Sequence, residues 1–314
     1  MKKWPSSLEL QKKVCQGVIL KYEDGCETIH YIDSQLSRNI INQGSFKPTP
    51  NFKSSQIIKN GISLIGKADN AYFHFPVDYV WYFYLQNFSE DDIKNCKIII
   101  RKTSRTKFKT QWIKIIFPFV KEDSFIFLES DKSINCINLI PSGKSCGTLT
   151  WNFYTKPEIK SIRDMIIKNL DLSNTNPSSL LLIKRNRVRT LKNWEEVYKI
   201  CKKYCEDRNL KLEVFDDSRE LGDVSSQLKK FNSAKIVVGC HGAGFTNIIS
   251  CNEETYFIEF KSIELREKKD RADSSCFQKL AEKLNLNNHF LDKTDAEGVD
   301  IKKFSDMLFN ITKE

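Results

Sequence analysis

Short apolar runs alternate with amphipathic segments along the second half of the chain. The runs SLLLIKR (179–185), KIVVG (235–239) and TYFIEF (255–260) have the length of buried strands. Between such runs, apolar residues recur three and four positions apart over 157–170 and 194–206, which predicts helices with one buried face. This alternation of strands and helices is typical of a parallel sheet with right-handed crossovers.

The same half contains further short elements of both kinds. We expect one more strand, two short helices and two terminal helices: 210–215, 222–232, 244–250, 274–286 and 299–312. Asn193 and Glu196 have the spacing of a capping box, in which each side chain bonds a backbone N–H at a helix start. The helix over 194–206 is therefore predicted to begin at this pair.

The first half also mixes strands with helices. GVILKYEDGCETIHYI predicts a hairpin around Asp24 and Gly25, and the polar residues 38–70 predict loops with at most one short strand. AYFHFPVDYVWYFYLQNF (71–88) predicts a buried helix with Pro76 near its first turn. Three strands and an amphipathic helix complete this half: 96–101, 124–129, 133–141 and 105–118.

A stretch typical of a linker separates the two halves. PSGKSCGTLTW (141–151) combines Pro, Ser and Gly without an apolar period. The pattern therefore predicts two α/β domains, 1–150 and 151–290, and a C-terminal helical segment, 291–314, that packs back on the first domain. The 314 residues are 40% hydrophobic, which is enough for two separate cores.

The net charge adds an expectation about partners. The chain has 50 Lys and Arg residues against 40 Asp and Glu residues, a formal charge of +10. Two stretches concentrate the excess, RKTSRTKFKTQWIK (101–114) and KRNRVRTLK (184–192). This balance favours a phosphorylated small molecule, a nucleic acid or an acidic membrane surface as partner. A solvated lysine-rich surface explains the same overall charge.

Targeting and redox features indicate the cytoplasm. No run reaches the roughly 18 apolar residues of a membrane span, and no apolar segment follows the lysines of MKKWPSSLELQKK. The ten cysteines are scattered without zinc-site spacing, which favours free buried thiols in a reducing compartment. We expect a cytoplasmic protein, with peripheral contact to an acidic membrane through 101–114 as one option.

Polar residues gather where the predicted strands of the second half end. Arg185 and Arg189 follow one strand, CHGAGFTN (240–247) follows another, and Glu259 lies near the end of a third. Because parallel sheets bind ligands at the carboxyl ends of their strands, we expect these groups to converge. Arginines and a helix N-terminus suit a diphosphate, and a carboxylate suits ribose hydroxyls. Taken singly, the glycine turn is also explained by packing and the arginine run by a solvated loop.

These segments resemble glycosyltransferase family 61. LLIKRNRVRTLKNWEEV and then FNSAKIVVGCHGAGFTNII are similar to the basic segment and the glycine turn of that family, over about residues 155–262. NAYFHFPVDYVWYFYL is similar to the helix of the family's amino-terminal domain that carries an N..H...D pattern. The chain departs from most plant and animal members in being shorter and in having no signal-anchor.

The resemblance implies a GT-B architecture, in which two Rossmann-like domains enclose a cleft, and inversion at the anomeric carbon. It makes 1–150 the acceptor-side domain and 151–290 the nucleotide-sugar-binding domain. Arg185 and Arg189 match the family's basic positions. The glycine turn matches at six residues: His241, Gly242, Ala243, Gly244, Thr246 and Asn247. UDP-xylose and UDP-N-acetylglucosamine are the family's commonest donors, and the implied acceptor is a hydroxyl of a glycan, glycoprotein or glycolipid.

The acceptor hydroxyl of such a reaction requires a general base. His74 and Asp78 are four residues apart in a predicted helix, so their side chains project together. We interpret Asp78 as the base, with His74 as second choice or as the group that orients it. A pair that only fixes its own turn and a pair that holds a metal remain open. The aromatic residues that follow favour core packing over a sugar platform: Tyr79, Trp81, Tyr82 and Phe83.

No D-x-D motif occurs in the chain. We therefore expect no metal and no other cofactor, with protein cations alone neutralising the diphosphate of a UDP-sugar.

Two other function classes compete with this interpretation. The alternative is a nucleotide- or nucleic-acid-binding α/β protein without transferase chemistry, for which 101–114 with Phe108 and Trp112 is the best support. No recognisable nucleic-acid-binding motif accompanies that stretch, so we expect no nucleic-acid partner. A hydrolase with His241 as base lacks a Ser or Cys nucleophile elbow near the turn.

Overall fold

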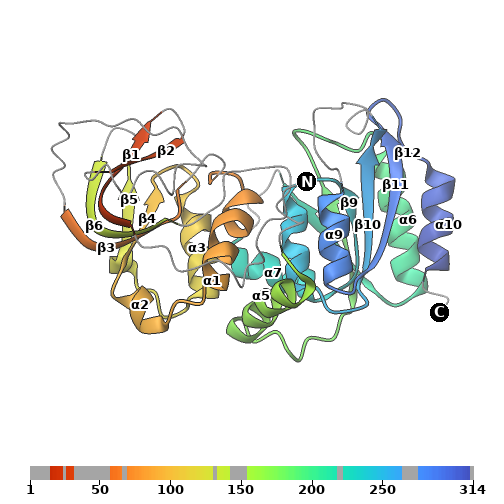
Figure 1. Ribbon diagram of the computed structural model, residues 1–314. Helices are drawn as coiled ribbons and strands as arrows, with labels where there is room; N and C mark the ends of the chain where they lie inside the picture. Colours follow the sequence, from red (N-terminus) through yellow and green to blue (C-terminus); the bar gives the residue numbers. More distant parts are fainter. Residues whose placement is uncertain are drawn as a thin grey trace. The chain divides into compact units, whose positions relative to one another are not determined.

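The chain divides into two compact units, Met1–Phe153 and Tyr154–Glu314. The computed structural model describes residues 15–23, 26–31, 57–65, 69–129, 133–141, 154–217, 222–263 and 275–311. Each unit combines one six-stranded sheet with helices (Figure 1). The predicted α/β class is confirmed, and most of the predicted linker, 142–151, lies outside the described residues.

The sheet of the second unit has the order β12-β11-β10-β9-β7-β8. Its strands are β7 (Ser179–Lys184), β8 (Lys211–Asp216), β9 (Ala234–Cys240), β10 (Tyr256–Ser262), β11 (Asn287–Thr294) and β12 (Gly298–Val299). All neighbours from β8 to β11 pair in parallel, and β12 is antiparallel to β11. If the parallel strands β7 to β11 are numbered 1 to 5 in chain order, their order across the sheet is 2-1-3-4-5. This is a doubly wound arrangement, and its switch point lies between β7 and β9.

Helices cover both faces of this sheet (Figure 1). They are α5 (Lys156–Asn169), α6 (Trp194–Asp207), α7 (Val224–Asn232), a 3₁₀ helix (Ala243–Ser250), α9 (Cys276–Lys283) and α10 (Ile301–Asn310). The core under α6 and α10 is fully buried and includes Leu182, Val238 and Phe260. On the opposite face, the ring of Phe245 lies 4.8 Å from Phe257 and 5.5 Å from Phe277, which joins the 3₁₀ helix and α9 to β10.

The C-terminal residues belong to the second unit. β11 extends to Thr294 and pairs in parallel with β10, where the pattern predicted a helical segment from 291. In α10, Phe304 lies 5.3 Å from Phe260 and Phe309 lies 5.2 Å from Tyr204, measured between ring centroids. A strand and a helix of the second unit therefore cover most of the expected helical segment 291–314, and its packing on the first domain stays a prediction.

The predicted capping box at Asn193 and Glu196 is wrong. Asn193 precedes α6 without a side-chain cap bond. Its Nδ2 instead donates to the carbonyl of Val299 at 2.7 Å, and the N–H of Val299 donates to its Oδ1 at 3.2 Å. Gly298 has a φ of +95°, and a Cβ there would lie 1.9 Å from Asn193 Oδ1. The amide of Asn193 thus pairs with β12 as a strand would, and this long-range contact competes with the local cap.

The sheet of the first unit has the order β2-β1-β6-β3-β4-β5. Its strands are β1 (Cys15–Glu23), β2 (Cys26–Tyr31), β3 (Ile57–Ser63), β4 (Lys97–Arg101), β5 (Phe125–Leu128) and β6 (Ser133–Pro141). β6, β3, β4 and β5 pair in parallel, and β1 is antiparallel to both β2 and β6. The predicted hairpin is confirmed by β1 and β2, although its turn residues lie outside the described residues.

The helix predicted over 71–88 begins as a π-helix. It runs from Phe75 to Trp81 and continues as α1 (Tyr82–Leu85), and Pro76 lies in its first turn. π-helices are rare and are frequent at functional sites. Phe75–Trp81 and Phe83 are buried, so the predicted core role of the aromatic residues is confirmed except for Tyr82, which is half-buried.

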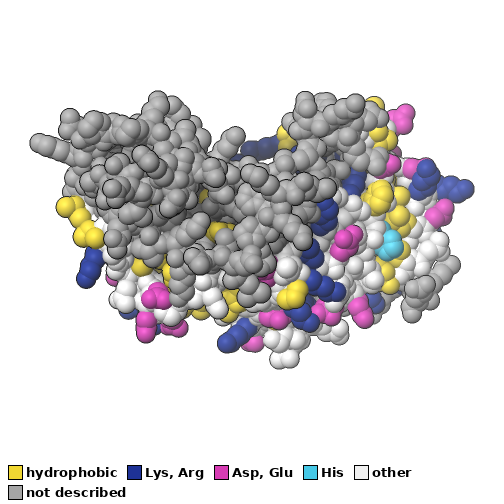
Figure 2. Space-filling model, viewed as in Figure 1, with side chains coloured by type: hydrophobic (Ala, Val, Ile, Leu, Met, Phe, Trp, Pro, Cys, Tyr) yellow, Lys and Arg dark blue, Asp and Glu magenta, His cyan; other side chains and the backbone are white. Residues whose placement is uncertain are grey.

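The described part of the first unit also contains α2 (Glu90–Lys94), α3 (Thr106–Ile116) and a short 3₁₀ helix (Glu122–Ser124). The sequence pattern predicted α3 and missed α2. Trp112 of α3 lies 6.1 Å from Trp81 of the π-helix, measured between ring centroids. On the face shown in Figure 2, basic and acidic side chains are interspersed over the described residues. The overall charge therefore does not form one continuous basic field there.

The Asn193 contact predicts a specific pattern of stabilities. Asn193→Ala removes two hydrogen bonds to the backbone of Val299, so the free energy of unfolding falls by about 1–3 kcal/mol in urea titrations. Glu196 is exposed, and Glu196→Ala changes it by less than about 0.5 kcal/mol. Equal losses in the two variants would restore the capping box and contradict the observed pairing.

Candidate functional site

Two arginines converge on one backbone oxygen at the switch point of the second unit. Arg185 and Arg189 lie in the loop that leaves β7, and the Nη1 atom of each donates to the carbonyl of His241, at 3.4 and 3.5 Å. His241 directly follows β9. The predicted convergence of these residues at the carboxyl ends of neighbouring strands is therefore observed, and this is the edge where doubly wound sheets bind ligands.

The glycines of this region provide space for close approach. At Gly242 a Cβ would lie 1.4 Å from Arg185 Nη1, and at Gly239 it would lie 2.7 Å from the Cβ of Ile183. Gly242 has a φ of 172°, an extended conformation that any residue adopts. Steric room for the guanidinium, and not backbone freedom, therefore explains Gly242. Gly244 has its nearest such contact at 3.6 Å, which leaves it partly accessible beside Ala243 at the start of the 3₁₀ helix.

Carboxylates of β8 and its following turn hold the arginine loop. The backbone N–H of Asn186 donates to Asp217 Oδ1 at 2.8 Å, and its Nδ2 donates to Asp216 Oδ1 at 2.7 Å. Arg185 Nε lies 3.7 Å from Asp217 Oδ2. Arg189 has a φ of 56°, in the left-handed region that non-glycine residues seldom adopt. These contacts keep both guanidinium groups directed towards His241.

The carboxylate of Glu259 contacts the imidazole of His241. The two residues lie 2.5 Å apart between Nδ1 and Oε1, and the side chain of Glu259 is fully buried. Lys261 has its Nζ 3.8 Å from Glu259 Oε2 and also bonds Gln278 of α9. The carboxylate of Glu259 is therefore enclosed between an imidazole and a buried ammonium, and its expected bond to ribose hydroxyls stays a prediction.

Thr246 and Asn247 build the 3₁₀ helix. Both are fully buried. Thr246 Oγ1 donates to the carbonyl of Ala243 at 2.8 Å, and Asn247 Nδ2 donates to Gln227 Oε1 at 3.3 Å. Their side chains thus make internal contacts, and their expected role in donor binding stays a prediction. The groups that remain accessible at the turn are His241, Ala243 and Gly244.

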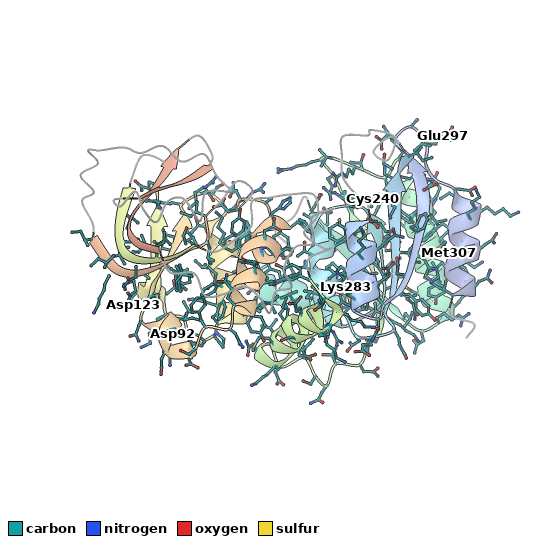
Figure 3. All side chains as sticks on the ribbon, in the orientation of Figure 1. Asp92, Asp123, Cys240, Lys283, Glu297 and Met307 are labelled. Carbon is teal, nitrogen blue, oxygen red and sulfur yellow. The ribbon has the colours of Figure 1, made fainter. Side chains whose placement is uncertain are left out.

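Cys240 is the last residue of β9, at the carboxyl end of an interior strand of the sheet (Figure 3). Its side chain is buried, and burial raises the pKa of the thiol to about 11. A protonated thiol is a poor nucleophile, so the residue does not supply the missing nucleophile of a hydrolase. Cys96, Cys201, Cys205 and Cys251 are free and buried as well, as expected from their spacing.

His74 and Asp78 form a second pair, in the first unit. His74 Nδ1 lies 2.7 Å from Asp78 Oδ2. The pair begins the helix that follows β3, at the carboxyl edge of the parallel strands. The side chain of His74 is 29% exposed, whereas that of Asp78 is 1% exposed. The imidazole is thus presented to solvent and the carboxylate is buried, and which of the two acts as base stays a prediction.

Three residues of this site were not predicted from the sequence: Lys261, and Asp216 and Asp217, whose carboxylates hold the arginine loop. Lys261 is two residues from Glu259 in a strand, so strand periodicity places both side chains on one face of the sheet. That signal was available. By contrast, Asp216 and Asp217 reach the loop only because β8 pairs with β7, which the sequence pattern does not specify.

The described residues contain no group of three or more His, Cys, Asp or Glu side chains arranged to hold a metal ion. Within the same residues, every helix is too short or too polar to cross a membrane.

Comparison with known families agrees with the fold and with the residues at the sheet edge. The family model described as Glycosyltransferase 61 matches residues 72–258, more than half of the chain, and this range includes His74 and Asp78 as well as the arginine loop and the glycine turn. A search of curated proteins found no match. The protein is a glycosyltransferase. The chain belongs to glycosyltransferase family 61, which implies a nucleotide-sugar donor and a glycan acceptor in general terms.

The coupling between the buried charges of Glu259 and Lys261 can be tested by unfolding experiments. Glu259→Gln leaves the ammonium of Lys261 buried without its carboxylate, so the free energy of unfolding falls by about 3 kcal/mol in urea titrations. Adding Lys261→Met removes the uncompensated cation and recovers more than half of this loss. A double variant no more stable than Glu259→Gln would show that the two charges are not coupled.

Proposed function

We propose that the protein is an inverting glycosyltransferase that transfers a sugar from a UDP-sugar to a hydroxyl of a glycan, glycoprotein or glycolipid. The convergence of Arg185 and Arg189 on the carbonyl of His241 carries the proposal. Two guanidinium groups beside the start of a helix suit the oxygens of a diphosphate. Xylose and N-acetylglucosamine are the proposed sugars, and the GT-B arrangement that the family resemblance implies is part of the proposal.

The chemistry requires charge stabilisation at the leaving group. When the bond between the anomeric carbon and the diphosphate breaks, negative charge develops on the β-phosphate. Arg185, Arg189 and His241 neutralise this charge in the proposed reaction, without a metal or another cofactor. Their backbone and side-chain anchors hold these groups in place before the reaction, so little reorganisation is needed.

His74 is the proposed general base. It accepts the proton of the acceptor hydroxyl, whose oxygen attacks the anomeric carbon from the face opposite the leaving diphosphate. Asp78 fixes the ring and stabilises the imidazolium that forms. The exposure of the two side chains supports this assignment, because only the imidazole is accessible to an acceptor.

A thermal-shift and calorimetric panel of UDP, GDP and CMP, with and without EDTA, tests the donor site. We expect UDP to stabilise the protein equally in both conditions. Arg185→Ala raises the Kd of UDP about ten- to a hundredfold, because a charge-assisted hydrogen bond is lost. Arg187 lies in the same loop with an exposed side chain, and Arg187→Ala serves as the matched control with an unchanged Kd. Undiminished UDP binding by Arg185→Ala would remove the arginine loop from the donor site.

The base assignment is tested by release of UDP from UDP-xylose and UDP-N-acetylglucosamine, with water as acceptor. His74→Ala lowers kcat by about 10²–10⁴-fold, because the proton acceptor is lost, and it leaves the Kd of UDP unchanged. Asp78→Asn keeps the shape of the pair and causes a smaller loss. If His74→Ala retains turnover while Asp78→Asn abolishes it, Asp78 is the base.

A further inference from the structure

We propose that Asp69, Arg101 and Lys109 form a buried clamp that positions His74 for proton transfer. The inference rests on the proposed role of His74 as base. It assigns a function to part of the basic stretch 101–114, for which charge alone suggested a membrane or a nucleic acid as partner.

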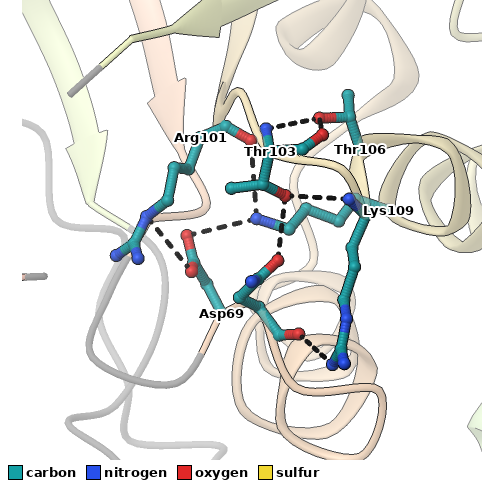
Figure 4. Close-up of polar contacts among 7 residues, drawn as sticks. Asp69, Arg101, Thr103, Thr106 and Lys109 are labelled. Carbon is teal, nitrogen blue, oxygen red and sulfur yellow. Dashed lines mark hydrogen bonds and ion pairs between the residues drawn. The ribbon is translucent and has the colours of Figure 1, made fainter.

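The clamp is a cluster of three charges, two of them fully buried and the third nearly so (Figure 4). Asp69 Oδ1 lies 3.4 Å from Arg101 Nε, and its Oδ2 lies 3.5 Å from Lys109 Nζ. Asp69 and Lys109 are fully buried, and the side chain of Arg101 is 11% exposed. Burial lowers the pKa of Lys109 to about 8. Two cations thus share one carboxylate in the interior, at a desolvation cost that a merely structural core avoids by using apolar residues.

The clamp holds the loop that leads into the π-helix. Asp69 lies five residues before His74, and the next residue, Asn70, is bonded twice by the segment after β4. Thr103 Oγ1 donates to Asn70 Oδ1 at 2.9 Å, and Arg105 Nη1 donates to the carbonyl of Asn70 at 3.0 Å (Figure 4). Side chains of the 101–109 segment therefore fix both the backbone and the side chains of the loop.

The clamp also contacts the helix that carries the catalytic pair. Lys109 Nζ lies 5.5 Å from the ring centroid of Phe75, the residue directly after His74. Phe108 of the same helix lies 5.9 Å from Phe75 and 5.5 Å from Tyr72. His74 is thus bracketed on both sides by residues that α3 holds, while Asp78 fixes its ring from within the helix. A displacement of about 1 Å at a catalytic group costs up to about a hundredfold in rate, so such bracketing matters for turnover.

The test combines kinetics with a spectroscopic signature of His74. Lys109→Met replaces a buried cation by an apolar chain of similar length, so a purely structural role predicts an unchanged or raised Tm and normal turnover. We expect the kcat for UDP release from UDP-N-acetylglucosamine to fall about ten- to a hundredfold, with the Kd of UDP unchanged. Lys109→Arg keeps the charge and restores most of kcat. Lys107→Met, at an exposed position of the same helix, is the matched control with normal kcat.

Carbon–proton spectra of ¹³C-histidine-labelled protein give a readout that does not depend on activity. The chain has four histidines, and His74→Gln assigns the resonance of His74. Lys109→Met moves that resonance and leaves the resonance of His241 in place. Arg105→Met, which removes only the bond to Asn70, has the same effects in smaller measure and replaces Lys109→Met if the latter does not fold.

The outcomes separate this inference from the proposed function. A His74 resonance that does not move, or a kcat within twofold of the wild type in folded Lys109→Met, overturns the clamp even if His74→Ala is inactive. If His74→Ala is active, the proposed base is wrong, and the resonance then shows whether the clamp still holds His74.

Discussion

The contact between the arginine loop and the turn after β9 depends on the close approach of β7 and β9. Gly239 lets the backbone of β9 pack against Ile183, and Gly242 leaves the volume that the guanidinium of Arg185 occupies. With a side chain at either position, the arginine loop and the turn after β9 would separate. Because the doubly wound order makes these two strands neighbours, the same packing forms the edge at which sheets of this kind bind ligands and brings both arginines to it.

His241 and the loop before His74 are each supported by buried charges. His241 is bonded to Glu259, which lies near Lys261, and the loop before His74 contains Asp69, which lies between Arg101 and Lys109. Buried charges contribute little net stability but strongly resist the loss of one partner. They therefore fix the position of the groups they contact at the expense of stability, which suits catalysis better than it suits folding.

The sequence predicted what depends on local pattern, and it failed where distant contacts decide. The alternation of strands and helices, the convergence of Arg185 with His241, and the core role of Trp81 follow from periodicity and strand direction. The role of Asn193 depends on β12, more than 100 residues away, and no local rule indicates it. Helical spacing also does not show whether His74 or Asp78 is the buried member of the pair, because either arrangement has the same i, i+4 separation.

Net charge was the least informative sequence feature, because it does not distinguish neutralised from unneutralised cations. In 101–114, Arg101 and Lys109 share Asp69, and Lys102 bonds Glu129 at 2.7 Å. In the arginine loop, by contrast, the guanidinium groups of Arg185 and Arg189 approach the same carbonyl oxygen of His241 and repel each other. A diphosphate placed there relieves that repulsion and gains two strong partners. The shorter basic stretch is therefore the one that suits an anionic ligand, because both guanidinium groups meet at the carboxyl ends of β7 and β9, where parallel sheets bind ligands.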